Sequence, residues 1–409
     1  MKIEQKAIKD LDISILDGDR GKNYPHQDEI FKAGYCLFLS ANNVTKKGFD
    51  FNETSYISKE KDETLRGGKI QRNDIIITTR GTVGNIAYYD DLIPYENIRI
   101  NSGMLIVRCG DKLNSKYIYY ALKNRWFQEQ IKSIQTGSAQ PQLPKSHFIQ
   151  MKLPVPSLNI QNRVANILWL LDQKINTNIR INDNLEKQAV ALYQSLFVNY
   201  ARLQKKEFVQ SELGNMPTGW SVKSLSDVTT NIRTRVRGNN YKVLSAINSG
   251  CLQPSEEYFT KQVFSKDISN YIVVEENDFA YNPSRINIGS IGLNALGYTG
   301  CVSPIYVVFR TEPEYHFFMD FFIKSPRFNE EIRARASGSV RQAVGYKDFG
   351  LIRLIYPPLS VVQQFNNEYE KILMCIKRNL AENLVLENLR DVLLSKLMTG
   401  EFDLSNIDF

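Results

Sequence analysis

The chain repeats itself, and this repetition constrains its fold more than any other feature of the sequence. Short segments recur in the same order and at a nearly constant distance of 201 to 205 residues. The recurring pairs are Leu39–Ala41 and Leu244–Ala246, Arg80 and Arg285, Gly84 and Gly289, Thr136–Ser138 and Ser337–Ser339, Phe148 and Phe349, and Pro156 and Pro357. Their common order indicates a tandem duplication of about 200 residues.

Each copy begins with short β-like runs that are separated by Gly, Asn and Asp, with short helices between them. We expect strands at 74–79, 104–108, 271–274 and 305–309, and helices at 115–130 and 316–323. A segment marked by proline follows in each copy, Leu153–Pro156 in the first and Tyr356–Pro358 in the second. Beyond it the apolar period changes from 2 to about 3.5 residues, which predicts a long helix.

The apolar residues of both long helices are spaced by three and four residues, as in a coiled coil. The first helix carries them from Val164 to Leu196, including Ile179, and the second from Phe365 to Leu397, including Leu380. The residues expected to pair the helices are Ile167, Leu171, Ile175, Leu185, Ile372, Ile376, Leu386 and Leu393. Two such helices in one chain would most simply pair with each other.

The direction of pairing is left open by chain length, because the intervening residues can return the chain to either end of the first helix. Antiparallel pairing is favoured, since it relates the two copies by a pseudo-twofold axis. Asn178, Asn182, Asn379 and Asn383 lie at or near the expected seam. They either occupy the seam, where a buried Asn fixes register, or face solvent.

The predicted fold class is therefore α+β. Two tandem globular α/β domains are each followed by a long helix, and the two helices pair as an antiparallel coiled coil with pseudo-twofold symmetry. The expected boundaries are 1–155 for the first globular domain, 156–200 for its helix, 201–356 for the second domain, 357–400 for its helix and 401–409 for a tail.

Composition excludes little. The net charge of +7 and the pI near 8.9 suit a polyanionic partner, although many ordinary proteins share these values. No apolar run approaches the roughly 20 residues of a membrane span, and the polar N-terminus lacks a secretion signal. The five cysteines and three histidines are dispersed, so neither disulfides nor a metal site is expected. We expect a cytoplasmic protein.

Several segments resemble the specificity subunits of Type I restriction–modification enzymes. They are Thr79–Asn85, Thr136–Pro141, Leu213–Trp220 and Leu394–Gly400, set in two β-rich units that each precede a long helix. The first copy lacks the Gly-x-x-Pro-x-Gly-Trp lead-in of the second, and Asn282–Arg285 stands where the first copy has Thr-Thr-Arg. The loop at Arg285 is therefore expected to differ from that at Arg80.

The resemblance implies a non-catalytic subunit whose two target recognition domains each read one half of a bipartite site in double-stranded DNA. It also implies that the helices dock two modification subunits, which methylate adenine, and that translocating restriction subunits join this core. No cofactor is expected on this chain, because S-adenosylmethionine, ATP and Mg²⁺ would bind the partner subunits.

Residues shared by both copies cannot specify bases if the two domains read different sequences. Arg80, Arg285, Ser138 and Ser339 are therefore assigned to phosphate contacts or turn geometry, and an internal salt bridge is equally open for the arginines. Polar residues that differ between the copies are candidates for base reading, namely Gln140, Gln142, Arg341 and Gln342. Arg233, Arg235 and Arg237 alternate, so an extended strand would place them on one side, either on DNA or in solvent.

Two other classes stay open. A self-sufficient DNA methyltransferase needs an Asn/Asp-Pro-Pro-aromatic loop and a Gly-rich cofactor turn, and the nearest match, Asn282–Arg285, has neither the second proline nor the ring. No Walker sequence for ATP and no compact nuclease carboxylate pair stands out, so no catalytic residue is assigned. A coiled-coil adaptor with β-rich ends and no nucleic acid is compatible with the composition.

Overall fold

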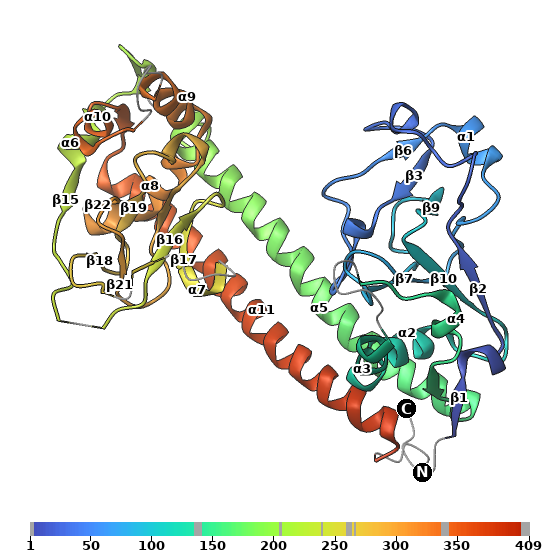
Figure 1. Cartoon of the computed structure of the whole chain (residues 1–409). Helices are drawn as coiled ribbons and strands as arrows, with labels where there is room; N and C mark the ends of the chain where they lie inside the picture. Colours follow the sequence, from blue (N-terminus) through green and yellow to red (C-terminus); the bar gives the residue numbers. More distant parts are fainter. Residues whose placement is uncertain are drawn as a thin grey trace. The chain divides into compact units, whose positions relative to one another are not determined.

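The computed structural model describes residues 4–134, 141–203, 207–238, 240–258, 264–265, 267–336 and 343–401. The chain divides into two compact units. Unit 1 comprises residues 1–179 and 380–409, and unit 2 comprises residues 180–379. Each unit therefore contains one globular domain together with part of both long helices, α5 (Leu158–Tyr193) and α11 (Leu359–Thr399) (Figure 1).

The globular part of unit 1 is a mixed α/β domain. Its elements are β1 (Gln5–Ala7), β2 (Ile13–Asp17), β3 (Cys36–Leu39), β4 (Val44–Thr45), β5 (Gly48–Phe49), β6 (Tyr56–Ile57), α1 (Lys59–Thr64), β7 (Ile75–Thr78), β8 (Ile86–Tyr88), β9 (Ile98–Ile100), β10 (Met104–Cys109), α2 (Ser115–Lys123), α3 (Arg125–Ile134), α4 (Lys145–Phe148) and β11 (Lys152–Pro154). The main sheet has the strand order β2-β10-β7-β8 and is antiparallel.

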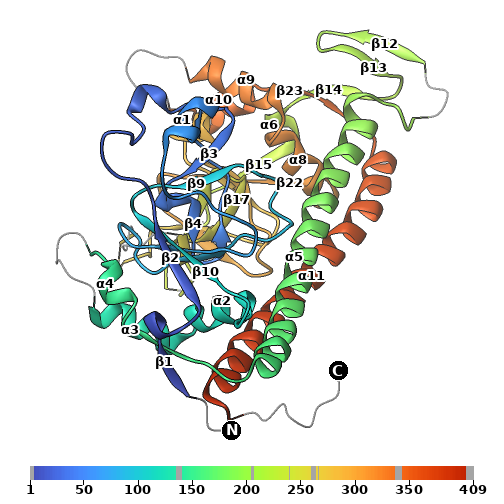
Figure 2. The same cartoon turned by 90° about the vertical axis from the view of Figure 1, so that its right-hand side faces the viewer.

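Unit 2 repeats this plan after an added hairpin. Its elements are β12 (Phe208–Ser211), β13 (Gly214–Pro217), β14 (Ser221–Ser224), α6 (Leu225–Val228), β15 (Thr229–Ile232), β16 (Leu244–Ile247), β17 (Cys251–Pro254), α7 (Ser255–Tyr258), β18 (Ile272–Val274), β19 (Phe279–Tyr281), β20 (Ile291–Leu293), β21 (Gly300–Val302), β22 (Val307–Thr311), α8 (His316–Ile323), α9 (Pro326–Arg335), α10 (Tyr346–Gly350) and β23 (Arg353–Tyr356). The hairpin β12-β13 is drawn clear of the sheets in Figure 2.

The two main sheets share their strand order, which confirms that the duplication extends to the fold. The order β15-β22-β19-β20 in unit 2 corresponds to β2-β10-β7-β8 in unit 1, and β17 and β16 extend the sheet of unit 2. The strands expected from the apolar runs are present as β7, β10, β18 and β22. The helix expected at 316–323 is α8, whereas that expected at 115–130 is two helices, α2 and α3.

The division between α2 and α3 has a local cause. Asn124 leaves the helical conformation with ψ 141, and its side-chain Oδ1 accepts a hydrogen bond from the backbone N of Trp126 at 2.9 Å. An Asn side chain that accepts from the backbone two residues later starts a new turn rather than continuing a helix.

The cores lie where α5 and α11 meet the globular parts. In unit 1, residues of β7 and β10 pack with α2 and with Val164 and Leu168 of α5. In unit 2 the corresponding core is aromatic, with Tyr193 of α5 stacked on Phe321 of α8 at 5.1 Å and close to Phe365 of α11. Each long helix therefore buries one face against a domain as well as against the other helix.

Candidate nucleic-acid interface

A tight loop after β7 presents Arg80. The backbone N atoms of Thr79 and Arg80 both donate to the carbonyl O of Gly103, at 2.8 and 3.2 Å. Gly81 and Gly84 take the left-handed conformation, with φ of 74° and 92°, which favours glycine. The Arg80 side chain is exposed and its guanidinium has no ion-pair or hydrogen-bond partner among the described residues. An internal salt bridge is therefore not seen for Arg80 within that part of the chain.

The matching loop of unit 2 follows β19 and carries Arg285. Gly289 has φ 89°, close to that of Gly84, so the shared glycine performs the same turn in both units. A short 3-10 helix, Ile286–Ile288, follows Arg285 and is lacking from the loop of unit 1. The two loops differ as the sequence predicts. Arg285 is also exposed, and its guanidinium has no ion-pair or hydrogen-bond partner in the ranges that the structure describes.

The second expected DNA-contacting segment adjoins these loops. Gln142 forms an isolated β-bridge with Arg80, and the backbone N of Leu143 donates to Thr79 O at 3.0 Å. In unit 2, Val344 N donates to Pro283 O at the same distance. Arg80 and Gln142 are thus brought together. Ser138, Gln140, Ser339, Arg341 and Gln342 lie outside the described residues, so their assignments stay predictions.

The arginine run of unit 2 is only partly extended. Thr234 and Val236 pair with the segment 271–273 through backbone hydrogen bonds, and Arg235 forms a β-bridge with Ile272. Arg233 and Arg235 are exposed and line the same pocket. Arg237 has φ 56°, so the alternation expected for all three side chains ends before it. Arg237 is exposed but does not line that pocket.

A repeated ion pair holds both sheets, and the sequence did not predict it. Arg108 of β10 donates to Asp74 at 2.7 and 2.8 Å, and Arg310 of β22 donates to Asp278 at 2.6 and 2.9 Å. Both aspartates are almost fully buried. The hydrogen bonds to these carboxylates raise the pKa of each arginine. The signal was present as Asn-Asp at 73–74 and again at 277–278.

This ion pair lies at the start of the strand that leads to each arginine loop. Asn73 and Asn277 both have left-handed φ, of 72° and 68°, and each precedes the aspartate that leads into β7 or β19. The same strands end in the loops of Arg80 and Arg285. The turn, the ion pair and the strand therefore form a rigid support for an exposed arginine in each unit.

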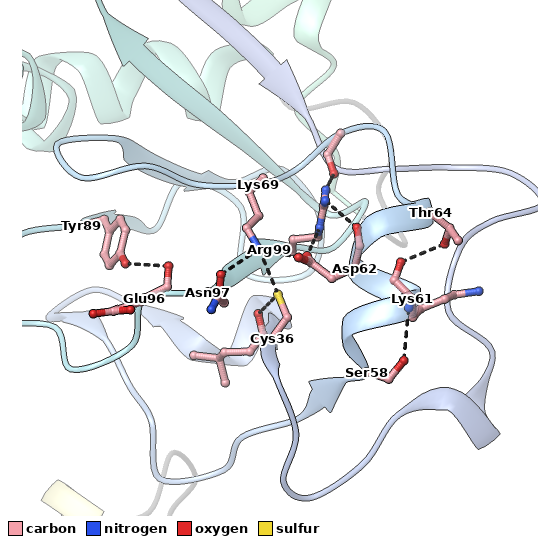
Figure 3. Close-up of polar contacts among 12 residues, drawn as sticks. Cys36, Ser58, Lys61, Asp62, Thr64, Lys69, Tyr89, Glu96, Asn97 and Arg99 are labelled. Carbon is pink, nitrogen blue, oxygen red and sulfur yellow. Dashed lines mark hydrogen bonds and ion pairs between the residues drawn. The ribbon is translucent and has the colours of Figure 1, made fainter.

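Unit 1 also contains a charged cluster beside α1, shown in Figure 3. Asp62 accepts hydrogen bonds from Arg99 Nε at 2.5 Å and Lys69 Nζ at 2.6 Å. Arg99 also donates to the carbonyl O atoms of Asp62 and Gly67. Cys36 lies beside Lys69, and burial, followed by the hydrogen bond with Asp62, raises the pKa of its thiol to about 12. The cluster is internal and ties α1 to β9 and β3.

The long helices run antiparallel, which is visible within each unit. In unit 1, Asp172 contacts Arg390 while Asn178 contacts Asn383. In unit 2, Asn182 contacts Asn379 while Arg202 contacts Glu368. As the residue number rises along α5 and the segment that follows it, the residue number of the contacted partner falls along α11. The antiparallel coiled coil expected from the spacing is confirmed.

All four seam asparagines are buried and pair across the helices. Asn178 Nδ2 donates to Asn383 Oδ1 at 2.8 Å in unit 1, and Asn379 Nδ2 donates to Asn182 Oδ1 at 2.8 Å in unit 2. The alternative in which they face solvent is wrong. The expected placing of Ile179 and Leu380 in the seam is also wrong, because both are about half exposed and the neighbouring asparagines take their places.

The other expected pairing residues are placed less uniformly. Ile175 is buried, whereas Ile167, Leu171, Leu185, Ile372, Ile376, Leu386 and Leu393 are partly buried. Ile167 and Leu393 pack against the core of unit 1. Leu168, which directly follows Ile167, is fully buried. The buried face of α5 is therefore shifted by one residue from the expected one where the globular domain also covers the helix.

Two features are absent from the described residues. No group of three or more His, Cys, Asp and Glu side chains there could hold a metal ion. No helix in the same ranges is long and apolar enough to cross a membrane.

The chain is similar in sequence to known specificity subunits. Residues 4–187 match the family model described as Type I restriction modification DNA specificity domain. The Type I restriction enzyme MjaIX specificity subunit of Methanocaldococcus jannaschii is 25% identical, covering 88% of this chain and 86% of the relative. The HindI specificity subunit of Haemophilus influenzae is 20% identical, with coverage of 94% and 98%.

Solved structures share the fold. The crystal structure of the type I restriction–modification S subunit from M. genitalium gives a TM-score of 0.57 at 15% identity, covering 97% of this chain and 96% of that one. The family resemblance seen in the sequence is confirmed by these matches, and so is the fold class. The expectation of a recognition subunit rather than an enzyme is confirmed by the same matches to specificity subunits.

Proposed function

Because its sequence and fold resemble those of type I DNA specificity subunits, we propose that this chain recognises a bipartite DNA site, with one half-site read by each unit. The observation that carries the proposal is the doubled support for an exposed arginine. Each unit uses a buried Arg–Asp pair to position a strand, and each strand ends in a loop with an exposed arginine, Arg80 or Arg285. An exposed arginine on a supported loop, present once in each unit, suits two separate contacts with one polyanion.

The proposed role of the shared arginines follows from their unpaired, exposed side chains within the described residues. Neither Arg80 nor Arg285 has a side-chain partner among the described residues, and both sit on loops fixed by glycine turns and backbone hydrogen bonds. Because they are common to both units, we assign them to phosphate contacts. Base reading is assigned to the residues that differ, among which Gln142 lies beside Arg80.

The helices are proposed to bind two modification subunits, which methylate adenine, and restriction subunits would join that assembly. Within unit 1, α11 exposes Val385, Leu389 and Val392, which lie close together in angle around the helix and away from the buried Asn383. Exposed apolar side chains grouped on one helical face are typical of a protein interface. This apolar stripe is the proposed docking surface in unit 1.

S-adenosylmethionine, ATP and Mg²⁺ are assigned to the partner subunits. The support is the family assignment, since a specificity subunit supplies recognition to subunits that carry the chemistry. Since its target is cellular DNA, we place the protein in the cytoplasm.

The test is DNA binding by the chain in complex with its cognate modification subunits. Affinity for host DNA should fall steeply as salt rises, and methylome sequencing of a host carrying the system should report one bipartite methylated motif. An absence of salt-sensitive DNA binding by the complex would favour a coiled-coil adaptor. Transfer of a labelled methyl group to DNA by the isolated, pure chain would instead indicate a self-sufficient methyltransferase.

A further inference from the structure

Unit 2 contains an open pocket of about 360 Å³ beside β15 and β22. Its polar lining comes from Asn231, Arg233, Arg235, Asn270, Tyr306 and Tyr346. The apolar part of the wall comes from Ile232, Ile272, Pro304, Ile305 and Val307. No carboxylate lines the pocket among the described residues.

The two guanidinium groups of the pocket are not neutralised. Arg233 has no ion-pair partner in the described part of the chain. Arg235 Nη1 donates to Asn270 Oδ1 at 2.7 Å, which orients the guanidinium but adds no negative charge. Two positive charges at one concave site, without a counter-charge, attract an anion.

The walls of the pocket are held by the backbone. Val236 N donates to Tyr271 O at 2.9 Å and Val273 N donates to Thr234 O at 2.8 Å, so Arg235 stands on a paired strand segment. On another side, Tyr346 donates its hydroxyl hydrogen to Thr229 O at 2.9 Å. A ligand would therefore meet side chains that stand on fixed backbone, which lowers the entropy cost of binding.

The register of the sheets identifies the counterpart of this pocket in unit 1. Arg310 pairs with Thr230 across β22 and β15, and the equivalent Arg108 pairs with Ser14 across β10 and β2. Three residues further along, Arg233 of unit 2 therefore corresponds to Asp17 of unit 1.

In unit 1 this position is neutralised. Asp17 lies 3.3 Å from Arg20 Nη2 and 3.8 Å from Lys145 Nζ. Lys145 also donates to Ile15 O at 2.7 Å. The same position thus carries an acid with its own cations in one unit and an unpaired arginine in the other.

We propose that the pocket of Arg233 and Arg235 binds a phosphate group of the DNA backbone, and that unit 1 has no equivalent subsite. This inference rests on the proposed function, since it names the group that unit 2 contacts in its half-site. Guanidinium groups match phosphate oxygens in geometry as well as in charge. The contact would position the second unit on DNA without reading a base.

The experiment uses the complex with its modification subunits and a duplex that contains the methylated motif. Arg233→Ala and Arg235→Ala should each weaken binding roughly tenfold, and the slope of log K against log salt should become shallower by about 0.9 for each phosphate that is no longer neutralised. Arg353→Ala is the matched control, because it removes one exposed charge from unit 2 where Glu212 pairs with it at 2.6 Å. This control should leave affinity and slope nearly unchanged.

Replacing single phosphates by neutral methylphosphonates locates the contact. One or two positions in a single half-site should weaken the wild-type complex, and the same positions should have no further effect on the Arg233→Ala Arg235→Ala variant. Arg233→Asp, which copies the residue of unit 1, should weaken binding more than Arg233→Ala.

Three outcomes would overturn the inference. One is an unchanged salt slope in the folded double variant, and another is an additive reduction of affinity from phosphonate and mutation at every position. The third is a reduction confined to one base pair of the motif, which would assign the arginines to guanine instead. If the wild-type complex itself shows no salt-sensitive binding, the proposed function fails rather than this subsite.

Discussion

Asp62 is a buried carboxylate that depends on two cations. Burial alone would raise its pKa, but the hydrogen bonds from Lys69 and Arg99 outweigh burial and hold the pKa below its ordinary value. A carboxylate with a lowered pKa stabilises the fold above its ordinary pKa of about 3.9. That contribution is lost as pH falls through the lowered value.

Asp62→Asn should therefore reduce the free energy of unfolding of unit 1 by about 3 kcal/mol at neutral pH, because the buried Arg99 and the partly buried Lys69 lose their counter-charge. Denaturant unfolding checks this, and the difference from wild type should shrink below about pH 4. Glu4→Gln is the control, since Glu4 pairs with Lys6 on the surface at 3.1 Å and should contribute less than about 1 kcal/mol. A pH-independent difference would contradict the ionic explanation.

Arg80 and Arg108 offer a matched comparison within unit 1. Arg80→Ala should leave stability unchanged and weaken DNA binding to a similar degree for all sequences, because an exposed arginine on phosphate carries no base information. Arg108→Ala should lower stability, since it leaves the buried Asp74 without its cation. Thermal unfolding and fluorescence anisotropy distinguish these effects. Normal DNA binding by the Arg80→Ala protein would show that Arg80 faces solvent and does not contact DNA.

The seam of α5 and α11 is specified by polar pairs as much as by apolar packing. Buried Asn–Asn pairs in coiled coils lower stability but favour one register, because a shifted pairing leaves amides unpaired. The pairs 178–383 and 182–379 occur where the apolar spacing is interrupted. They account for the exposure of Ile179 and Leu380.

Asn178→Leu should destabilise the protein by roughly 1–3 kcal/mol, because Asn383 is left buried without its partner. Adding Asn383→Leu should recover this stability or exceed it, so the two changes should be strongly non-additive in a double-mutant cycle. The pair 182–379 provides the matched cycle in unit 2. Additive effects in both cycles would show that the amides do not act as pairs.

The apolar stripe of α11 predicts a partner contact. Val385→Asp with Val392→Asp should weaken association with the modification subunit while leaving the thermal midpoint of this chain nearly unchanged, because both side chains are exposed. Gln173→Glu with Asn176→Asp introduces the same charge on exposed positions of α5 and should not affect assembly. Analytical ultracentrifugation measures both. Equal assembly of the two variants would exclude this face of α11 as the docking surface.

At the scale of the whole molecule, each unit has its own sheet and core. Replacing residues 1–155 by the same domain of a relative should therefore change one half of the methylated motif and preserve the other. The replacement must keep Tyr120, which donates to Asp172 of α5 at 2.6 Å, because this contact joins the domain to its helix. Methylome sequencing gives the answer. Loss of both halves in a folded, assembled chimera would argue against independent reading.

The sequence by itself determined the architecture. A repeat at a near-constant distance predicts two like units, and apolar spacing of three and four over many turns predicts a long helix that buries an apolar stripe. Gly84 and Gly289 were also readable, because a glycine repeated beside an arginine indicates a turn that requires its freedom. The apolar spacing and the glycine turns depend on residues that are close in the sequence, so they can be recognised without knowledge of the fold.

Only the tertiary structure decided which arginines form ion pairs within the protein. The sequence shows no pairing for Arg99 and Arg108, yet they are paired with Asp62 and Asp74, from segments more than thirty residues away. The structural correspondence of Arg233 with Asp17 also required the structure, because it comes from strand register and not from the repeat distance in the sequence. Ion pairing depends on which segments meet in space, and one residue of shift along a strand or helix changes the partner.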